Sequence, residues 1–184
     1  MELSPLKARI KGRLAKREID VLAGEVLSGS IRLGDLRPLL FENPRDQLFN
    51  LYWLLATVAG RRPEALKELV GDLFKAMCLH AANESVVRSS LSVFKVMDIP
   101  GEVEDGLYDF CFRVIQAPGS SIAHRSSALL ICARLCRKYP DLAGELLPAV
   151  KLIGETYGAD SPGVRAAVRQ VYKLLTPRSN KSYP

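Results

Sequence analysis

The amino-acid sequence predicts an all-α fold in which antiparallel pairs of helices stack side by side. Amphipathic helical runs alternate with short turn-like segments along most of the chain. Three of these runs open with an arginine followed by small side chains, at Arg88, Arg125 and Arg165. These arginines are 37 and then 40 residues apart. A period near 40 made of two helices indicates an α-solenoid, in which no unit buries its apolar face alone.

The residues around each arginine support a repeated packing arrangement. The repeated stretches read VRSSL at 87–91, HRSSA at 124–128 and VRAAV at 164–168, and a small or polar segment precedes each one. Small residues after the arginine let one helix backbone approach its partner closely. We expect the following apolar positions to face the stack: Val87, Leu91, Phe94, Leu129, Cys132, Leu135, Val168, Val171 and Leu175.

The first 60 residues are less regular. Residues 4–16 are predicted to form a helix with an apolar stripe of Leu3, Leu6, Ile10 and Leu14. A second helix is predicted to cover 17–28 and to stop near Gly29. Residues 34–41 are a short helical stretch broken by Pro38. Residues 44–59 form a strongly apolar helix.

Beyond residue 60 two kinds of helix alternate. The A helices, each beginning beside a proline, are predicted at 63–80, 101–117 and 141–157, and Pro148 should kink the last. The B helices, each beginning with the arginine motif, are predicted at 84–97, 121–138 and 161–176. We expect a single domain over 1–184, with a basic N-terminal capping region at 1–43, helical repeats at 44–176 and a frayed tail at 177–184.

Composition is that of an ordinary soluble protein. The chain has 184 residues, of which 48% are hydrophobic and 25% charged, and no apolar run approaches the roughly 20 residues of a spanning helix. All four cysteines lie in apolar helical runs, which favours core positions in a reduced, cytoplasmic environment. Neither His80 nor His124 completes a zinc-binding spacing, so no metal site and no cofactor is predicted.

The net charge of +6 is unevenly distributed. Residues 1–17 carry six basic side chains against Glu2 alone, which indicates a basic N-terminal arm. The A helices carry four basic and ten acidic residues, whereas the B helices carry nine basic residues and one acidic residue. This segregation either pairs charges between helices or creates a basic surface that attracts an acidic partner.

The motif arginines sit where the helix dipole disfavours a cation. We expect each guanidinium to hydrogen-bond a neighbouring turn carbonyl. Arg165, Arg169 and Lys173 step by four along the last helix, and this stripe is the predicted ligand-facing run, with an ordinary solvated face as the alternative. The full set of candidate partner-binding residues is Arg88, Lys95, Arg125, Arg165, Arg169 and Lys173.

The order of an A helix, a polar turn and a B helix opened by Arg and small residues resembles the HEAT repeat, which is closely related to the armadillo repeat. Stretches such as 98–102 (DIPGE) and 161–165 (SPGVR) look like a group of short bacterial HEAT-like proteins of unassigned function. The resemblance implies a right-handed α-α superhelix, with the B helices lining a basic concave side. It also implies a turn aspartate that binds repeat backbone or the motif arginine, and only Asp160 fits that position.

No catalytic motif is complete. The segment 119–121 (GSS) is similar to the mobile loop of the fumarase and adenylosuccinate-lyase superfamily, but the Lys and Asn that should come after it are missing. His124 is interpreted as an exposed residue at a helix start, and the acidic cluster at 102–105 as ordinary helix-start charge. The sequence therefore predicts no catalytic residues.

Two classes of function remain. The first is a non-catalytic scaffold that binds a protein or acidic peptide on a basic concave face. The second is a nucleic-acid-binding protein resembling the HEAT-like alkylpurine DNA glycosylases. Aromatic residues that could stack on a base are scarce on the B helices, where only Phe94 and Tyr172 occur, and Trp53 is expected in the core. The protein-binding class is therefore preferred.

Overall fold

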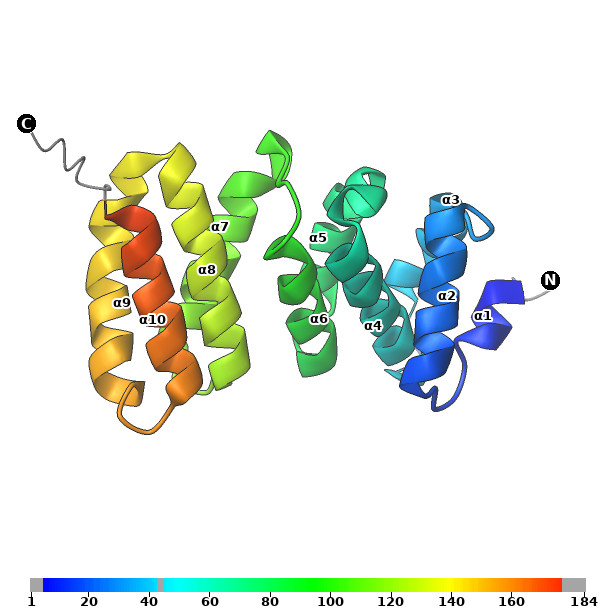
Figure 1. The fold of residues 1–184 in the computed structure, drawn as a ribbon, viewed down its shortest axis with the longest axis horizontal. Coiled ribbons are helices and arrows are strands. Elements are labelled where there is room, and N and C mark those ends of the chain that lie inside the picture. The colour runs from blue at the N-terminus through cyan, green and yellow to red at the C-terminus, as the bar shows by residue number, and fades with distance from the viewer. Residues whose placement is uncertain (1–4, 43–44, 177–184) are drawn as a thin grey trace, which may run out of the picture. The chain divides into compact units, whose positions relative to one another are not determined.

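The computed structural model describes residues 5–42 and 45–176, and every regular element in these ranges is a helix. The all-α prediction is thus confirmed (Figure 1). The chain divides into two compact units, Met1–Asp105 and Gly106–Pro184, here called unit 1 and unit 2. The tail predicted to fray at 177–184 lies outside the described residues.

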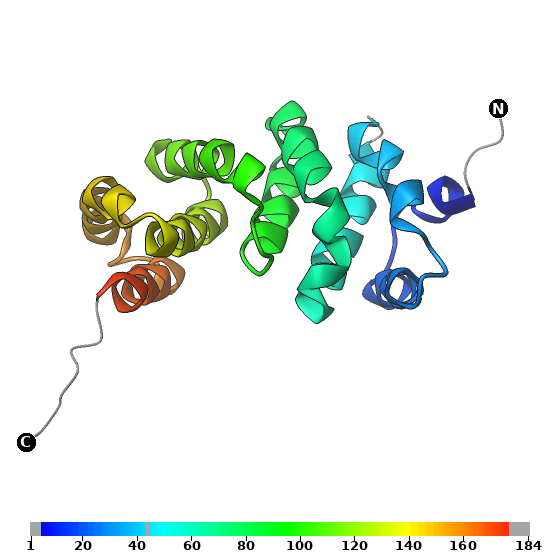
Figure 2. The same cartoon turned by 90° about the horizontal axis from the view of Figure 1, so that it is seen from above.

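Unit 1 holds its helices in two layers. Its elements are α1 (Pro5–Arg9), α2 (Lys16–Ser28), α3 (Leu33–Leu36), the 3₁₀ helix η1 (Pro38–Phe41), α4 (Arg45–Arg61), the 3₁₀ helix η2 (Pro63–Leu69), α5 (Val70–Leu79) and α6 (Glu84–Phe94). Helix α4 packs between α2 and α6, and these three form one layer. In the second layer, α5 contacts both η1 and η2 (Figure 2).

Unit 2 contains two helix pairs. Its elements are α7 (Gly101–Gln116, of which the first residues belong to unit 1), α8 (Ile122–Lys138), the 3₁₀ helix η3 (Pro140–Leu142), α9 (Ala143–Tyr157) and α10 (Pro162–Leu175). Helix α8 packs against α9 and α10, and α9 and α10 also contact each other. Tyr108 of α7 donates a hydrogen bond to the carbonyl of Leu142 at 3.4 Å.

The predicted A and B helices are confirmed to within about three residues at each end. Gly29 ends α2 with a left-handed φ of 81°, as the sequence indicated. Two A helices differ at their starts, because Pro63 and Pro140 open short 3₁₀ segments before the α-helix begins. Proline at the first position of a helix has no amide hydrogen to leave unsatisfied, so either helical form can begin there.

The predicted core positions of the B helices are mostly buried. Side chains at Val87, Leu91, Phe94, Leu129, Cys132, Leu135 and Val171 are buried, whereas Val168 and Leu175 are half-buried. Two expectations for unit 1 were wrong. Trp53 is half-buried rather than in the core, and Cys78 is exposed, unlike the other three cysteines.

The first helix is shorter than predicted. The sequence predicts a helix over 4–16, but α1 ends at Arg9 and the chain turns through Gly12, whose φ is 81°. The carbonyls of Ile10 and Gly12 accept hydrogen bonds of 2.9 and 2.6 Å from the side-chain amide of Asn50 on α4. Asn50 is only 1% exposed. This long-range contact stabilises a turn that local periodicity does not reveal.

From Pro5 onward, the basic N-terminal segment packs against the rest of unit 1 and is therefore not a free arm. Leu6 and Ile10 are buried. Arg9 makes a two-pronged ion pair with Glu25 at 2.6 and 2.8 Å. Lys7 pairs with Glu42 at 2.6 Å. Half of the cationic charge at 1–17 therefore has an acidic partner, once the pair of Lys16 with Asp20 is included.

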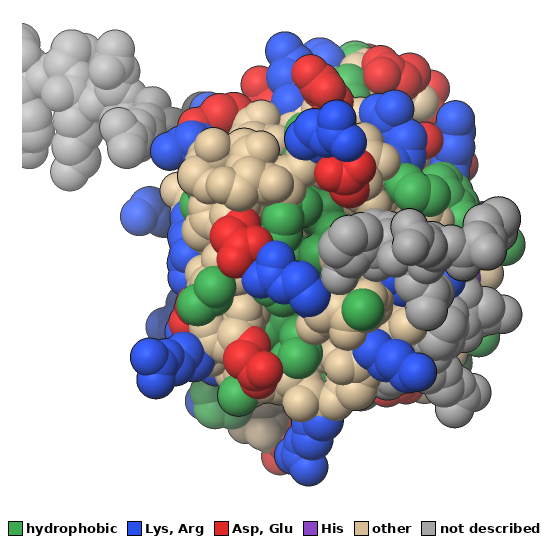
Figure 3. Space-filling model, turned by 90° about the vertical axis from the view of Figure 1, so that its right-hand side faces the viewer, with side chains coloured by type: hydrophobic (Ala, Val, Ile, Leu, Met, Phe, Trp, Pro, Cys, Tyr) green, Lys and Arg blue, Asp and Glu red, His purple; other side chains and the backbone are tan. Residues whose placement is uncertain are grey.

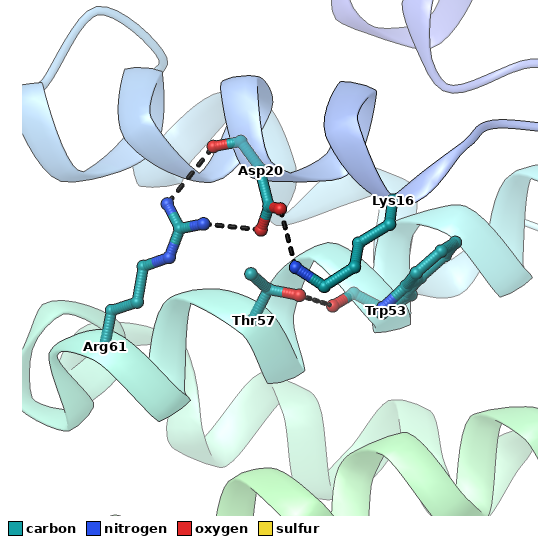
Figure 4. Close-up of polar contacts among 5 residues, drawn as sticks. All are labelled: Lys16, Asp20, Trp53, Thr57 and Arg61. Carbon is teal, nitrogen blue, oxygen red and sulfur yellow. Dashed lines mark hydrogen bonds and ion pairs between the residues drawn. The ribbon is translucent and has the colours of Figure 1, made fainter.

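Asp20 joins α2 to α4. Figure 4 shows its carboxylate between Lys16, one turn earlier on α2, and Arg61 at the end of α4. Arg61 also donates to the backbone carbonyl of Asp20 at 3.1 Å. One carboxylate thus pairs with a cation of its own helix and anchors a second helix.

Replacing Asn50 by alanine should release the N-terminal segment. Two backbone carbonyls would lose their donor in a buried site, which we expect to lower the free energy of unfolding by about 2 kcal/mol. Chemical denaturation measures this loss, and limited proteolysis should show faster cleavage between residues 10 and 15. Thr57→Ala is the matched control, because the hydroxyl of Thr57 bonds within α4. Equal stability and cleavage for N50A and T57A would contradict the assigned role.

Acid should weaken the contacts of α2. The hydrogen bond from Lys16 lowers the pKa of Asp20 below 3.8, and that from Arg9 lowers the pKa of Glu25 below 4.5. A pKa lowered by folding stabilises the fold above the ordinary value, and this contribution is lost as the pH falls through the folded-state value. Wild type should therefore lose more stability between about pH 5 and pH 3 than the double variant Asp20→Asn, Glu25→Gln. Parallel denaturation midpoints for the two proteins across that range would contradict this expectation.

Candidate functional site

The motif arginine of α8 is buried and holds a turn. Ser121 caps α8 by accepting a hydrogen bond from the amide of His124 at 3.3 Å. Four residues after this cap, Arg125 is 3% exposed. Its Nε donates to the carbonyl of Ile115 at 3.3 Å, and its Nη2 donates to Ala117 and Pro118 at 2.5 and 2.9 Å. The guanidinium also lies 4.2 Å from the ring centre of Tyr157 on α9.

The arginine of α10 repeats this arrangement. Ser161 caps the helix through the amide of Val164 at 3.2 Å, and Arg165 again lies four residues after the cap. Its Nη1 donates to the carbonyls of Gly158 and Ala159 at 2.7 and 2.9 Å. The predicted hydrogen bond from a motif arginine to turn carbonyls is confirmed at Arg125 and Arg165.

Arg88 departs from the pattern because its register is different. Asn83 caps α6 through the amides of Ser85 and Val86, and Arg88 lies five residues after it instead of four. One residue turns a side chain by about 100° around a helix. Val87 therefore takes the buried position of the other two arginines, and Arg88 is exposed with no side-chain hydrogen bond to any described residue. Aligning the three repeats by their arginines therefore shifted the α6 repeat by one residue relative to the other two.

The turn aspartate implied by the HEAT resemblance plays no comparable part. Asp160 is exposed, and the described residues offer it no ion pair with Arg165. Hydroxyls of Ser121 and Ser161 and the amide oxygen of Asn83 satisfy the helix-start amides instead. Both Arg125 and Arg165 bind backbone directly.

Helices α8 and α10 form a surface with one sign of charge. Together they carry seven basic residues and no acidic residue, and they pack side by side. The exposed members are Arg137, Lys138, Arg165, Arg169 and Lys173. We call this set the α8–α10 basic surface. Arg137 and Lys138, in the last turn of α8, belong to this surface. The sequence analysis included them in the charge of the B helices but did not name them as candidate partner-binding residues.

The candidate residues of unit 1 have a different setting. Arg88 on α6 is exposed, and Lys95, the C-terminal cap residue of α6, is half-buried. The same helix begins with Glu84, so its charges are of both signs. On the face of the molecule that carries α1 and α2, basic and acidic side chains alternate without a large patch of either sign (Figure 3). The ion pairs of Lys7, Arg9 and Lys16 are among the reasons, since each cation contacts a carboxylate.

Buried groups in unit 2 are poor candidates for chemistry. Cys111, Cys132 and Cys136 are buried, and burial raises the pKa of Cys136 to about 11 and that of Cys132 well above its usual value. Thiols in this state are protonated near neutral pH and react slowly. His124 is 8% exposed, so its interpretation as an exposed helix-start residue was wrong.

Within the described residues, no three His, Cys, Asp or Glu side chains gather in a way that could hold a metal ion. No helix in the described ranges has the length and apolar character needed to cross a bilayer. The acidic cluster at 102–105 opens α7 and includes Glu104, which is buried.

Comparison with protein families identifies the family of this chain. A HEAT repeat domain model matches residues 6–175, nearly the whole chain, including α1 to α3 at its start. Searches of curated proteins and of solved structures found no match.

The loss of unfolding free energy on replacing each motif arginine should increase with the burial of that arginine. Arg125→Lys keeps the charge but cannot reach three carbonyls at once, and we expect a loss of about 2–3 kcal/mol in unfolding free energy. Arg165→Lys should cost about 1 kcal/mol because its site is exposed, and Arg88→Lys less than about 0.5 kcal/mol. Chemical denaturation of the three variants tests the order. An Arg88→Lys loss as large as that of Arg125→Lys would contradict the register argument.

Proposed function

The chain belongs to the HEAT repeat domain family, and from this premise we propose that it is a non-catalytic scaffold that binds a protein or acidic peptide on the α8–α10 basic surface. HEAT repeat domains are typically protein-interaction scaffolds and usually lack catalytic activity. Stacked helix pairs of this kind present extended, rigid surfaces suited to binding other chains.

The observation that carries the proposal is the charge of α8 and α10, which is entirely basic. Arg165, Arg169 and Lys173 lie one turn apart and span about 12 Å along α10. Arg137, Arg169 and Lys173 make no ion pair with any described residue. A surface of one sign speeds encounter with an oppositely charged partner and favours it over others.

The remaining candidate residues have different weights in this proposal. Arg165 is exposed but already holds two carbonyls, so it would contribute charge more than new hydrogen bonds. Arg125 is not a member of this surface, because its guanidinium lies against Tyr157 of α9 and binds the carbonyls of the turn before α8. Arg88 and Lys95 belong to unit 1 and are not members of the α8–α10 basic surface.

A nucleic acid is the alternative partner for the same cations. A run of about 12 Å reaches only three or four phosphates of one strand, given a spacing of about 3.4 Å per strand. Tyr172, 39% exposed, is the single aromatic residue on α8 and α10, so base stacking has one platform at most. These features favour an acidic polypeptide.

Charge reversal at Arg169 and Lys173 should abolish partner binding. The double variant Arg169→Glu, Lys173→Glu leaves the turn contacts of Arg165 intact, and its retained proteins can be identified by mass spectrometry after affinity isolation from nuclease-treated extract. The matched control is Arg113→Glu, Lys151→Glu, which makes the same charge change on α7 and α9. We expect acidic partners of wild type to be kept by the control and lost by the R169E/K173E protein.

Two outcomes would contradict this proposal. The first is an identical set of retained proteins for the wild type and both variants. The second is loss of every partner on nuclease treatment, together with binding of labelled DNA or RNA that weakens steeply between about 50 and 200 mM salt. Fluorescence anisotropy of the purified chain with a labelled oligonucleotide measures the latter directly.

A further inference from the structure

A second surface of unit 2 has the features of a ligand site. A groove of about 590 Å³ runs between α7 and α9, within the size range of small-ligand and peptide pockets. Apolar side chains make up much of its lining, among them Phe112, Ile115, Ala149, Leu152 and Ile153. Leu152 is 62% exposed, so its side chain is accessible to a ligand on the wall of the groove.

The two ends of the groove carry opposite charges. Arg125 lines one end, beside Tyr157, and Glu145 lines the other. Glu145 and Tyr157 are twelve residues apart on α9, which corresponds to about 18 Å. The groove therefore has a cationic end, an apolar middle and an anionic end.

Neither charge has an ion-pair partner within the described residues. Arg125 is 3% exposed, yet it makes no ion pair, and the three carbonyls that it binds use Nε and Nη2 only. Its Nη1 donates no hydrogen bond to a described residue. Glu145 is exposed, accepts a hydrogen bond from the Tyr108 hydroxyl and likewise pairs with no cation there. The unused Nη1 edge can donate to an incoming carboxylate, and hydrogen bonds between ionised groups are stronger than neutral ones.

We propose that this groove, here called the α7–α9 groove, binds a short peptide segment with an acidic residue at one end, a basic residue at the other and large apolar residues between. An extended chain rises about 3.3 Å per residue, so five or six residues span the roughly 18 Å between the charges. A simple amphiphilic acid could satisfy Arg125 and the apolar wall, but it would leave Glu145 without an ion-pair partner. The opposite charges at the two ends therefore favour a peptide.

The test uses blocked, fluorescein-labelled hexapeptides and the full-length chain. The first peptide, Lys-Leu-Ala-Phe-Leu-Glu, carries one charge of each sign, and the second, Glu-Leu-Ala-Phe-Leu-Glu, is acidic at both ends. Wild type should bind the first more tightly by anisotropy. Glu145→Lys should reverse this preference, with a change of about threefold or more for each peptide, the size of an exposed ion pair.

The apolar wall is tested at Leu152. Leu152→Gln should weaken binding of the first peptide about tenfold, as expected when a buried leucine contact is lost. Leu79→Gln is the matched control, because Leu79 is 65% exposed on α5 of unit 1, outside this groove. Neither substitution removes a buried side chain, and circular dichroism melting confirms folding of each variant.

The outcomes separate this proposal from the scaffold function of the α8–α10 basic surface. Arg169→Glu, Lys173→Glu should bind the first peptide as wild type does, because those residues do not line the groove. Equal losses for Leu152→Gln and Leu79→Gln, or an unchanged preference in Glu145→Lys, would overturn the groove assignment. So would the absence of binding of either peptide at about 1 mM, a concentration at which even weak peptide complexes form.

Discussion

Each unit depends on helices that cover apolar surface on two neighbours at once. Helix α4 shows this most clearly, since it packs against α2 and α6 and its Leu51, Leu54, Leu55 and Val58 are all buried. A helix with one apolar stripe could form only a pair. Apolar residues around more of the circumference allow a pair to be extended in both directions, which is the physical basis of a stacked repeat.

Local patterns predicted the helices well because helix formation and capping depend on nearby residues. The cap residues Asn83, Ser121 and Ser161 and the positive φ of Gly29 all fall where the sequence placed turns. Register was harder to predict. The motif arginines are identical, but Arg88 lies one residue further from its cap, and only the cap position shows that Val87 is its true counterpart.

Long-range contacts explain what the sequence could not reveal. The basic N-terminal segment was interpreted as an arm because its neighbours in sequence are not acidic. Its partners lie far along the chain, Glu25 for Arg9 and Glu42 for Lys7, and Asn50 is forty residues from the turn that it holds. The α7–α9 groove has the same origin, since Arg125 and Glu145 come from different helices and line one groove only through packing.

The two arginines that hold turns in unit 2 differ in burial because only one of them is covered by a neighbouring helix. Tyr157 of α9 lies over the guanidinium of Arg125, whereas no later helix in the described residues covers Arg165. The same motif therefore produces a buried cation at one end of a groove and an exposed cation on a basic surface. Hydrogen bonds to turn carbonyls fix the position of each arginine. The presence or absence of a covering helix then determines whether the guanidinium lies at an apolar groove or faces solvent. In unit 2, the same arginine motif therefore contributes to two chemically distinct surfaces.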